Sequence, residues 1–213
     1  VSRASAYTRI LPPVINPRDK PMKHAISLAL GLCASSFAFG QAASIPVGTA
    51  LTIFENQKVV VVQTAKGPVE ITRTMTACGK NGGTIQPVVP VPGVHPIGET
   101  EIIQALGDRN ALVVDMRDTN DRVKGTIPGS ISIPYTEVVD RLSELGCTKT
   151  ASTWNCAAAK QVYAFCNGPT CPQSPIAIRA MTREGFPADK IYYYRGGMLD
   201  WDALGLTSVK NEF

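Results

Sequence analysis

Runs dominated by apolar residues alternate with amphipathic stretches from residue 97 onward. The apolar runs predict strands at 111–115, 130–133, 161–165 and 190–194. The amphipathic stretches predict helices at 99–106, 136–145, 175–185 and 197–204. The helix expected at 136–145 has a Thr136 cap and one apolar face, made of Val138, Val139, Leu142 and Leu145. Strands that alternate with helices indicate a parallel α/β sheet, with reactive groups beyond the carboxyl ends of its strands.

Three short β-prone runs come before this region. They lie at 51–54, 59–62 and 69–72, and a turn signal at 66–68 separates the last two. We therefore expect two or three strands that form a small hairpin unit. The glycine- and proline-rich stretch 78–96 indicates a linker or an extended segment packed along the main domain, or else an edge that contacts a partner protein.

The beginning of the chain has the pattern of an export signal. A basic start at 22–24 is followed by an apolar stretch at 25–39 and by small residues suited to cleavage at 40–43. That stretch is short for a membrane span, which needs about 20 residues. The alternative is a buried N-terminal helix behind a disordered leader. We expect export to a bacterial periplasm and four parts: a leader at 1–21, a signal peptide at 22–43, a β extension and linker at 44–93, and the main domain at 94–213.

Charge and composition narrow the classes of ligand. The chain has 213 residues and a net charge of +4. The charged residues are scattered, and basic and aromatic residues do not cluster, so nucleic acid is not an expected partner. His24 falls in the expected signal peptide, His95 stands alone, and no Cys-x-x-Cys spacing occurs. We therefore expect no metal, no other cofactor and no membrane span in the mature chain.

Export also bears on the cysteines, because an oxidising compartment favours their pairing. Cys147 and Cys156 bracket a polar insertion, and we expect a disulfide between them. Cys78 is then left over, either free or paired with a partner protein.

The run 165–175 places Cys166 in a loop of small residues between an expected strand and an expected helix. Gly168 lets the loop backbone approach closely, and Ser174-Pro175 reads as an N-cap followed by a first-turn proline. Backbone N–H groups and a helix N-terminus favour a thiolate, which is the reactive form of cysteine. A nucleophilic thiol is the leading hypothesis; the alternatives are an inert buried cysteine and a Cys166–Cys171 disulfide.

Motifs around this loop resemble those of the rhodanese family. Residues 113–117 resemble its Asp-x-Arg strand end, residues 125–130 its Gly-His-Ile-Pro-Gly-Ala turn with Thr126 replacing histidine, and residues 194–201 its Gly-Gly-x-x-x-Trp element. They occur in order, with Cys166 where the family carries its catalytic cysteine. The resemblance implies a rhodanese-like fold with a central parallel five-stranded sheet flanked by helices. The β extension would be an addition to that fold.

The resemblance also implies a sulfurtransferase. Cys166 would take sulfane sulfur from thiosulfate or a persulfide or polysulfide donor, hold it as a persulfide, and pass it to a thiol or a cyanide-like acceptor. The backbone of the loop would form the anion cradle, made of Asn167, Gly168, Pro169, Thr170 and Cys171. Residues expected near the substrate are Asp115, Arg117 and Arg195.

Three features of the loop leave the function open. Cys171 is a candidate resolving thiol, which could attack the persulfide or simply pack in the loop. The loop residues 167–173 carry no charge, unlike common family loops. The sequence therefore supports sulfur transfer in general better than it supports the dianion thiosulfate as the donor. Pro172 stands where phosphatases of the same fold have arginine, which disfavours phosphoryl transfer. The alternatives are a non-catalytic partner-binding module of the cell envelope and a thiol–disulfide redox protein that uses Cys166 and Cys171.

Overall fold

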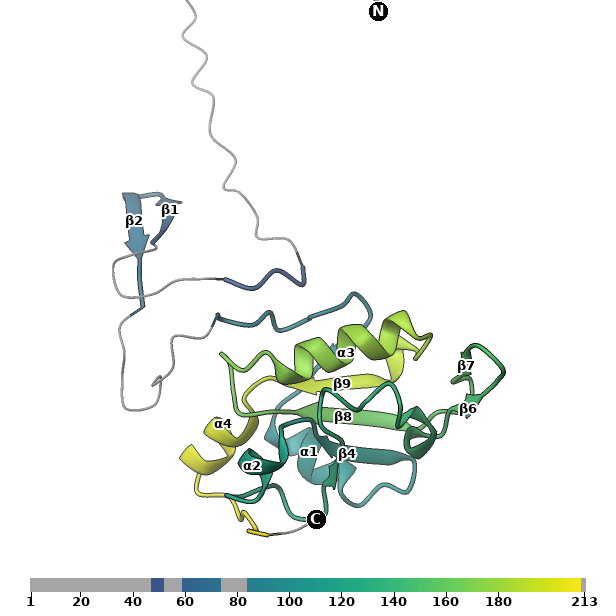
Figure 1. Ribbon diagram of the computed structural model, residues 1–213. Helices are drawn as coiled ribbons and strands as arrows, with labels where there is room; N and C mark the ends of the chain where they lie inside the picture. Colours follow the sequence, from purple (N-terminus) through teal and green to yellow (C-terminus); the bar gives the residue numbers. More distant parts are fainter. Residues whose placement is uncertain (1–46, 52–58, 74–83, 212–213) are drawn as a thin grey trace, which may run out of the picture. The chain divides into compact units, whose positions relative to one another are not determined.

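The computed structural model describes residues 47–51, 59–73 and 84–211. Every described residue lies in one compact unit, which spans 41–213. At its centre is a five-stranded sheet in the order β3-β9-β8-β4-β5, with all neighbours parallel (Figure 1). In that order the strands are His95–Pro96, Ile191–Tyr194, Gln161–Phe165, Ala111–Asp115 and Ile131–Ser132. The predicted parallel five-stranded α/β sheet is confirmed.

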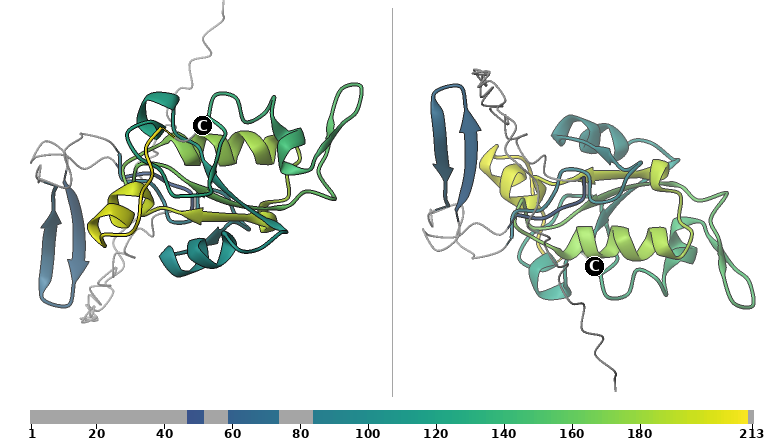
Figure 2. Two further views of the ribbon diagram at one scale, coloured as in Figure 1. Left: turned by 90° about the horizontal axis from the view of Figure 1, so that it is seen from below. Right: turned by 90° about the horizontal axis from the view of Figure 1, so that it is seen from above.

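Helices cover both faces of the sheet, as Figure 2 shows. The helical elements are α1 (Glu99–Ala105), α2 (Thr119–Arg122), α3 (Gln173–Arg183) and α4 (Gly197–Ala203), with 3-10 turns η1 (Leu142–Leu145) and η2 (Ala188–Lys190). One core includes Val114 of β4 and Ile178 of α3; the other includes Val113 of β4 and Trp201 of α4. Because neighbouring residues of β4 serve opposite cores, the strand must be apolar on both faces.

The prediction of an α-helix at 136–145 is wrong. Residues 135–141 form successive turns, and only Leu142–Leu145 is helical, as a 3-10 helix. Val138, Leu142 and Leu145 are nevertheless buried. The spacing of apolar residues therefore identified the inward face, whereas the backbone hydrogen bonds are mostly those of tight turns, such as Asp140 N to Glu137 O.

The helix after the cysteine loop also begins differently from the prediction. α3 starts at Gln173 with Pro172 as its N-cap residue, so Ser174 lies inside the first turn and does not cap the helix. The Ser174 side chain is fully buried beside the loop.

The predicted hairpin is present in the N-terminal part. β1 (Val60–Thr64) and β2 (Gly67–Ile71) pair antiparallel, and their side chains are largely exposed. In the run 51–54 only Leu51 is described; it forms a bridge with Ile85. Of the interpretations for 78–96, the packed extended segment is found in 84–96, where Gln86 and Val94 are buried.

Some predictions fall on parts of the chain that the structure does not describe. The leader at 1–21, the signal peptide at 22–43 and Cys78 lie outside the described residues. The boundary between extension and main domain at 93/94 stays a prediction. Within the described ranges, every helix is too short or too polar to cross a bilayer.

The polar insertion is a small disulfide-closed hairpin. β6 (Thr148–Lys149) pairs antiparallel with β7 (Trp154–Asn155), and a disulfide joins the flanking residues Cys147 and Cys156. The expected disulfide is confirmed. Both half-cystines are buried against the core that contains Leu145.

Candidate active site

Cys166 directly follows β8, which lies between β9 and β4 in the middle of the sheet (Figure 1). The loop 166–172 then leads into α3, so the thiol lies at the carboxyl edge of the sheet and near a helix N-terminus, as the sequence predicted. Cys166 and Cys171 are both free cysteines. Cys166 is only 1% exposed, so the resting loop covers its sulfur.

Hydrogen-bond donors around the Cys166 sulfur oppose the effect of burial. Burial disfavours the thiolate, but the Cys171 thiol, the Ser174 hydroxyl and the N–H groups of Ser174 and Gly168 outweigh it, and together they lower the pKa of Cys166 to about 7. As a neutral thiol, Cys166 donates to the Cys171 carbonyl oxygen at 3.4 Å. The site therefore favours a nucleophilic sulfur at neutral pH.

The surroundings of Cys171 favour its protonated form. Its hydrogen bond to Cys166, its burial and the negative charge of the Cys166 thiolate all raise the pKa of Cys171 above its ordinary value. Its Sγ also lies 3.5 Å from Gln173 Oε1, and Gln173 in turn donates to Asp118. Cys171 is thus the protonated donor of the pair and Cys166 the anion.

The anion cradle differs in detail from the five-residue loop predicted for it. The Gly168 N–H serves the sulfur, but Ser174, beyond the predicted range, contributes two donors. The Cys171 N–H is used within the loop by the Gly168 carbonyl, and Pro169 has no N–H to offer. Sequence reasoning missed Ser174 because it treated this residue as a helix cap.

The Ser174 hydroxyl itself is an unusual group. It is fully buried and has no hydrogen-bond partner of ordinary geometry among the residues described, although it lies close enough to the Cys166 sulfur to lower the pKa of that thiol. A buried hydroxyl without a partner is costly, and such groups occur at reactive sites. The geometry suits a hydroxyl that gains its partner when Cys166 ionises.

The loop backbone is held by the start of α4. The N–H groups of Met198 and Leu199 donate to the carbonyl oxygens of Cys166 and Asn167 at 3.0 and 2.9 Å. Gly197 has φ +57°, and a Cβ at this position would overlap the Cys166 carbonyl oxygen. The Gly-Gly motif is thus required for the close approach of α4 to the cysteine loop.

Asp115 and Arg117 form a buried ion pair below the loop. Asp115 accepts from Arg117 at 2.9 and 2.6 Å and from the Thr126 hydroxyl at 2.7 Å. Arg122, which sequence reasoning did not single out, adds a second buried guanidinium at 3.5 Å. Asp115 therefore acts as a structural hydrogen-bond acceptor. Thr126, which stands where the rhodanese motif has histidine, is one of its donors.

Arg117 connects this ion pair to the loop through Asn167. Its Nη1 donates to Asn167 Oδ1 at 3.2 Å, and Asn167 Nδ2 donates to Asp121 Oδ2 at 2.6 Å. Burial raises the pKa of Asp121, but hydrogen bonds from Lys124 and Asn167 lower it further than burial raises it. These residues line a polar hollow of about 280 Å³ beside Met198 and Leu199. Arg117 thus orients Asn167, and the contacts described do not bring its guanidinium to the Cys166 sulfur.

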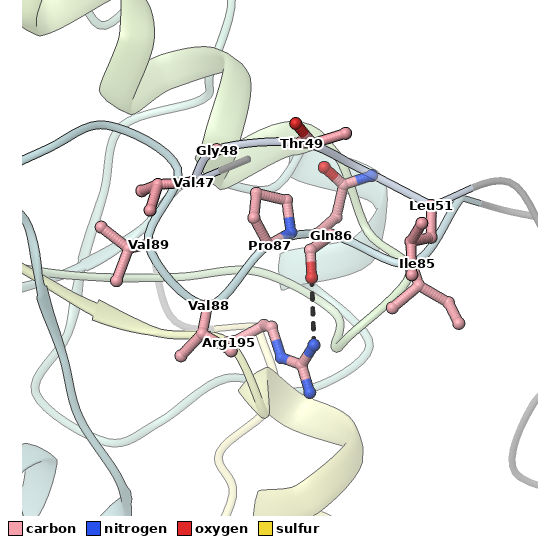
Figure 3. A pocket seen from close by; sticks show the side chains of 10 residues that line it. All are labelled: Val47, Gly48, Thr49, Leu51, Ile85, Gln86, Pro87, Val88, Val89 and Arg195. Carbon is pink, nitrogen blue, oxygen red and sulfur yellow. Dashed lines mark hydrogen bonds between the residues drawn. The ribbon is translucent and has the colours of Figure 1, made fainter. Parts of the chain in front are cut away.

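The extended N-terminal segment contacts the same loop from another side. The Gln86 N–H donates to the Pro169 carbonyl oxygen at 2.8 Å. The Gln86 carbonyl accepts from Arg195 Nη1 at 3.0 Å, so Arg195 is directed to this segment (Figure 3). Gln86 was not among the residues expected at the site.

Comparison with known protein families identifies the fold. A model of the rhodanese-like domain matches residues 99–204, from the first residue of α1 to the end of α4. The chain contains a rhodanese-like domain. The match carries no information on what the two-cysteine loop does.

Individual relatives of this rhodanese-like domain are distant. The HTH-type transcriptional regulator Rv0324 of Mycobacterium tuberculosis is 29% identical over 110 residues, which are 52% of this chain and 42% of the regulator. The chain thus spans less than half the length of that relative. A thiosulfate sulfurtransferase from Pseudomonas aeruginosa is 27% identical, with 54% of this chain and 20% of that chain covered and a TM-score of 0.41. A rhodanese-related protein from Thermoplasma volcanium is 19% identical, with 54% and 97% covered and a TM-score of 0.40.

The N-terminal part of the described chain lies outside the residues that match the family model. Cys166, Cys171, Asp115 and Arg195 lie inside the match, whereas β3 and the segment that holds Gln86 lie before it. The contact between Gln86 and Pro169 therefore joins an added segment to the loop of the family domain.

Proposed function

We propose that the protein is a sulfurtransferase that carries sulfane sulfur as a persulfide on Cys166. One observation carries this proposal: Cys166 is a free cysteine whose pKa is lowered to about 7 despite its burial. Donors placed by the loop and by the first turn of α3 support the thiolate, and no cationic side chain is needed for this. The rhodanese-like domain is the setting in which such a thiol transfers sulfur.

The reaction we propose has two steps. The Cys166 thiolate attacks the sulfane sulfur of thiosulfate, the new S–S bond forms, and sulfite leaves with the electron pair of the broken bond. A thiolate or cyanide then attacks the outer sulfur of the persulfide, which releases the Cys166 thiolate. A persulfide or polysulfide donor would react in the same way, with a thiolate or a shorter polysulfide as the leaving group.

Cys171 has a supporting role in this proposal. Because the pKa of Cys171 is raised, its thiol keeps its proton and can donate a hydrogen bond to the Cys166 thiolate before the first step and after the second. As a resolving thiol, it would attack the Cys166 sulfur, form a Cys166–Cys171 disulfide and pass its proton to the departing hydrosulfide. An external dithiol would then have to reduce the pair.

The burial of Cys166 favours a second candidate, a rhodanese-like module that binds a partner without catalysis. At 1% exposure, the thiol reacts only after the loop or the segment against it moves. If that movement did not occur, the domain would offer a folded surface and no chemistry.

Sulfur transfer from thiosulfate to cyanide and to dithiothreitol tests the proposal. We expect turnover by the unaltered protein and by Cys171→Ser, and loss of turnover in Cys166→Ser to the level of the uncatalysed reaction. Retained turnover in Cys166→Ser would contradict the assignment. No turnover with either acceptor, together with an unmodified Cys166 after donor treatment, would favour the partner-binding module.

The cellular compartment in which the protein acts is also proposed. We propose that the mature protein works in the bacterial periplasm, where the Cys147–Cys156 disulfide would persist. Fractionation of cells that express the full chain tests this, and recovery in the cytoplasm with an uncleaved N-terminus would contradict it.

A further inference from the structure

A hollow of about 320 Å³ lies between the two N-terminal segments and Arg195 (Figure 3). It is lined by residues 47–49, 51 and 85–89, with Arg195 as the charged member. Only Arg195 belongs to the residues that match the rhodanese family. The hollow is therefore built by the added segments on the surface of the family domain.

Close contacts hold the two segments together above this hollow. Leu51 and Ile85 exchange two backbone hydrogen bonds, each of 2.8 Å. Gly48 has φ +82°, and a Cβ there would come within 2.9 Å of the Pro90 carbonyl oxygen. Gln86 is anchored by Pro169 on one side and Arg195 on the other. These contacts make the hollow a defined feature of the fold.

Arg195 brings a positive charge that is not paired with a carboxylate in the described part of the chain. Arg117, Arg122 and Arg141 form salt bridges with Asp or Glu. Arg195, like Arg109, Arg179 and Arg183, forms none with any residue of 47–51, 59–73 or 84–211. Its Nη1 donates to the Gln86 carbonyl, and its Nη2 and Nε have no acceptor within those ranges. A guanidinium carries five donors, so one edge stays available for a planar anion.

The other walls of the hollow are mainly aliphatic. Val47, Leu51, Ile85, Val88 and Val89 line it. Figure 3 shows the three valines on one side of Gln86 and Pro87, and Leu51 and Ile85 on the other. The size of the hollow is at the lower end of small-molecule sites, which measure about 300–1,000 Å³. One available guanidinium edge and apolar walls match a ligand with one carboxylate and a short apolar body.

We propose that this hollow binds a small aliphatic carboxylate, with the carboxylate on Arg195 and the aliphatic chain against Val47, Val88 and Val89. The proposal does not depend on sulfur transfer, because binding needs neither Cys166 nor Cys171. A charge-assisted bidentate pair at a half-buried arginine provides the recognition.

Calorimetric titration of the full chain with hexanoate, and with hexanol as the uncharged probe, tests the site. We expect hexanoate to bind at least about tenfold more tightly than hexanol, the difference expected for hydrogen bonds to a charged group. Arg195→Gln keeps a polar side chain with hydrogen-bond donors but removes the charge, and it should abolish this preference. Arg179→Gln, at a half-buried arginine beside a different hollow, is the matched control and should retain it.

A second variant tests the other wall of the site. Gly48→Ala should displace residues 47–51 from Pro90 and weaken hexanoate binding while Arg195 is intact. Amide chemical shifts should locate hexanoate near Gln86 and Val88. Equal binding of hexanoate and hexanol, unchanged binding in Arg195→Gln, or shift changes confined to other surfaces would each overturn the proposal.

Discussion

Cys166 illustrates how single residues decide reactivity at this site. Its burial alone would raise the pKa of the thiol, because a charged sulfur is disfavoured away from water. Two groups of Ser174 and one of Gly168, together with Cys171, reverse this effect. The pH at which Cys166 reacts therefore reports directly on these donors.

The first prediction concerns Ser174→Ala. A pKa of about 7 means that the thiolate population rises through pH 7 and falls about tenfold for each unit below it. Removal of the Ser174 hydroxyl takes a donor from the anion, so the pKa of Cys166 should rise by about one unit. The measurement is the pH dependence of iodoacetamide labelling, with the label mapped to Cys166.

Ser143→Ala, at an exposed serine of η1, is the control and should leave the pH profile unchanged. A profile for Ser174→Ala that coincides with that of the unaltered protein would show that the hydroxyl does not serve the sulfur.

The sequence predicted the reactive cysteine but not its donors. Cys166 stood out because a strand, a small-residue loop and a helix follow one another there. Ser174 was expected to cap that helix, and only the true start at Gln173 turns its hydroxyl to the thiol environment. Arg117 and Arg195 were expected near the substrate. Instead, Arg117 contacts Asn167 and Arg195 contacts Gln86, and the sequence did not predict these contacts because the partners lie far apart in the chain.

At the scale of elements, the cysteine loop is held between α4 and the extended segment 84–91. The α4 side uses N–H groups of Met198 and Leu199, and the other side uses the Gln86 N–H. Because the resting sulfur is covered, the strength of these contacts should control how often it becomes accessible.

The second prediction separates the backbone of Gln86 from its side chain. Gln86→Pro removes the N–H that bonds to Pro169, whereas Gln86→Ala keeps it. Loss of this contact should loosen the loop, so Cys166 in Gln86→Pro should be alkylated several times faster at pH 8, and Gln86→Ala should remain close to the unaltered rate. Equal rates for both variants would exclude a role of this hydrogen bond in access.

The third prediction concerns the closeness of α4 to the loop. Gly197→Ala would force a Cβ into the Cys166 carbonyl oxygen at a positive φ, and we expect a loss of at least about 2 kcal/mol in the free energy of unfolding. Urea denaturation measures this. Gly107→Ala, whose Cβ would meet only an ordinary contact, should change stability by less than about 1 kcal/mol. Equal stability of the two variants would contradict the close approach.

The elements themselves were predictable where one pattern dominated. Strands at 111–115 and 161–165 were predicted with the bounds that are found, because short apolar runs have few alternatives. The segment 136–145 was not, since its apolar spacing is met by turns and a 3-10 helix that bury the same residues. Apolar spacing specifies which residues lie inside, and tertiary packing decides the backbone that brings them there.

At the scale of the whole molecule, two features lie beside the central sheet and its helices. One is the disulfide-closed hairpin β6–β7, which lies within the residues that match the rhodanese family, and the other is the N-terminal part with the β1–β2 hairpin, which precedes them. The sequence predicted the disulfide from the polar insertion that the two cysteines enclose. It left the segment 78–96 open, because glycine and proline are compatible both with a linker and with an extended segment packed on a domain.

The fourth prediction concerns the disulfide. The double variant Cys147→Ala/Cys156→Ala should lose about 2–3 kcal/mol in the free energy of unfolding, because the bond restricts the unfolded chain. Sulfur transfer by the folded protein should be retained, since neither half-cystine takes part in the described hydrogen bonds of the cysteine loop. The unaltered protein in excess reductant should show the same loss; unchanged stability in both would contradict the argument.

Sulfur transfer by this protein requires that Cys166 accept a sulfur atom, which intact-mass spectrometry detects after incubation with thiosulfate or polysulfide. We expect a gain of one sulfur, about 32 Da, mapped to Cys166, absent from Cys166→Ser and removed by cyanide. A mass that stays unchanged with both donors, or a gain of sulfur that persists in Cys166→Ser, would contradict it.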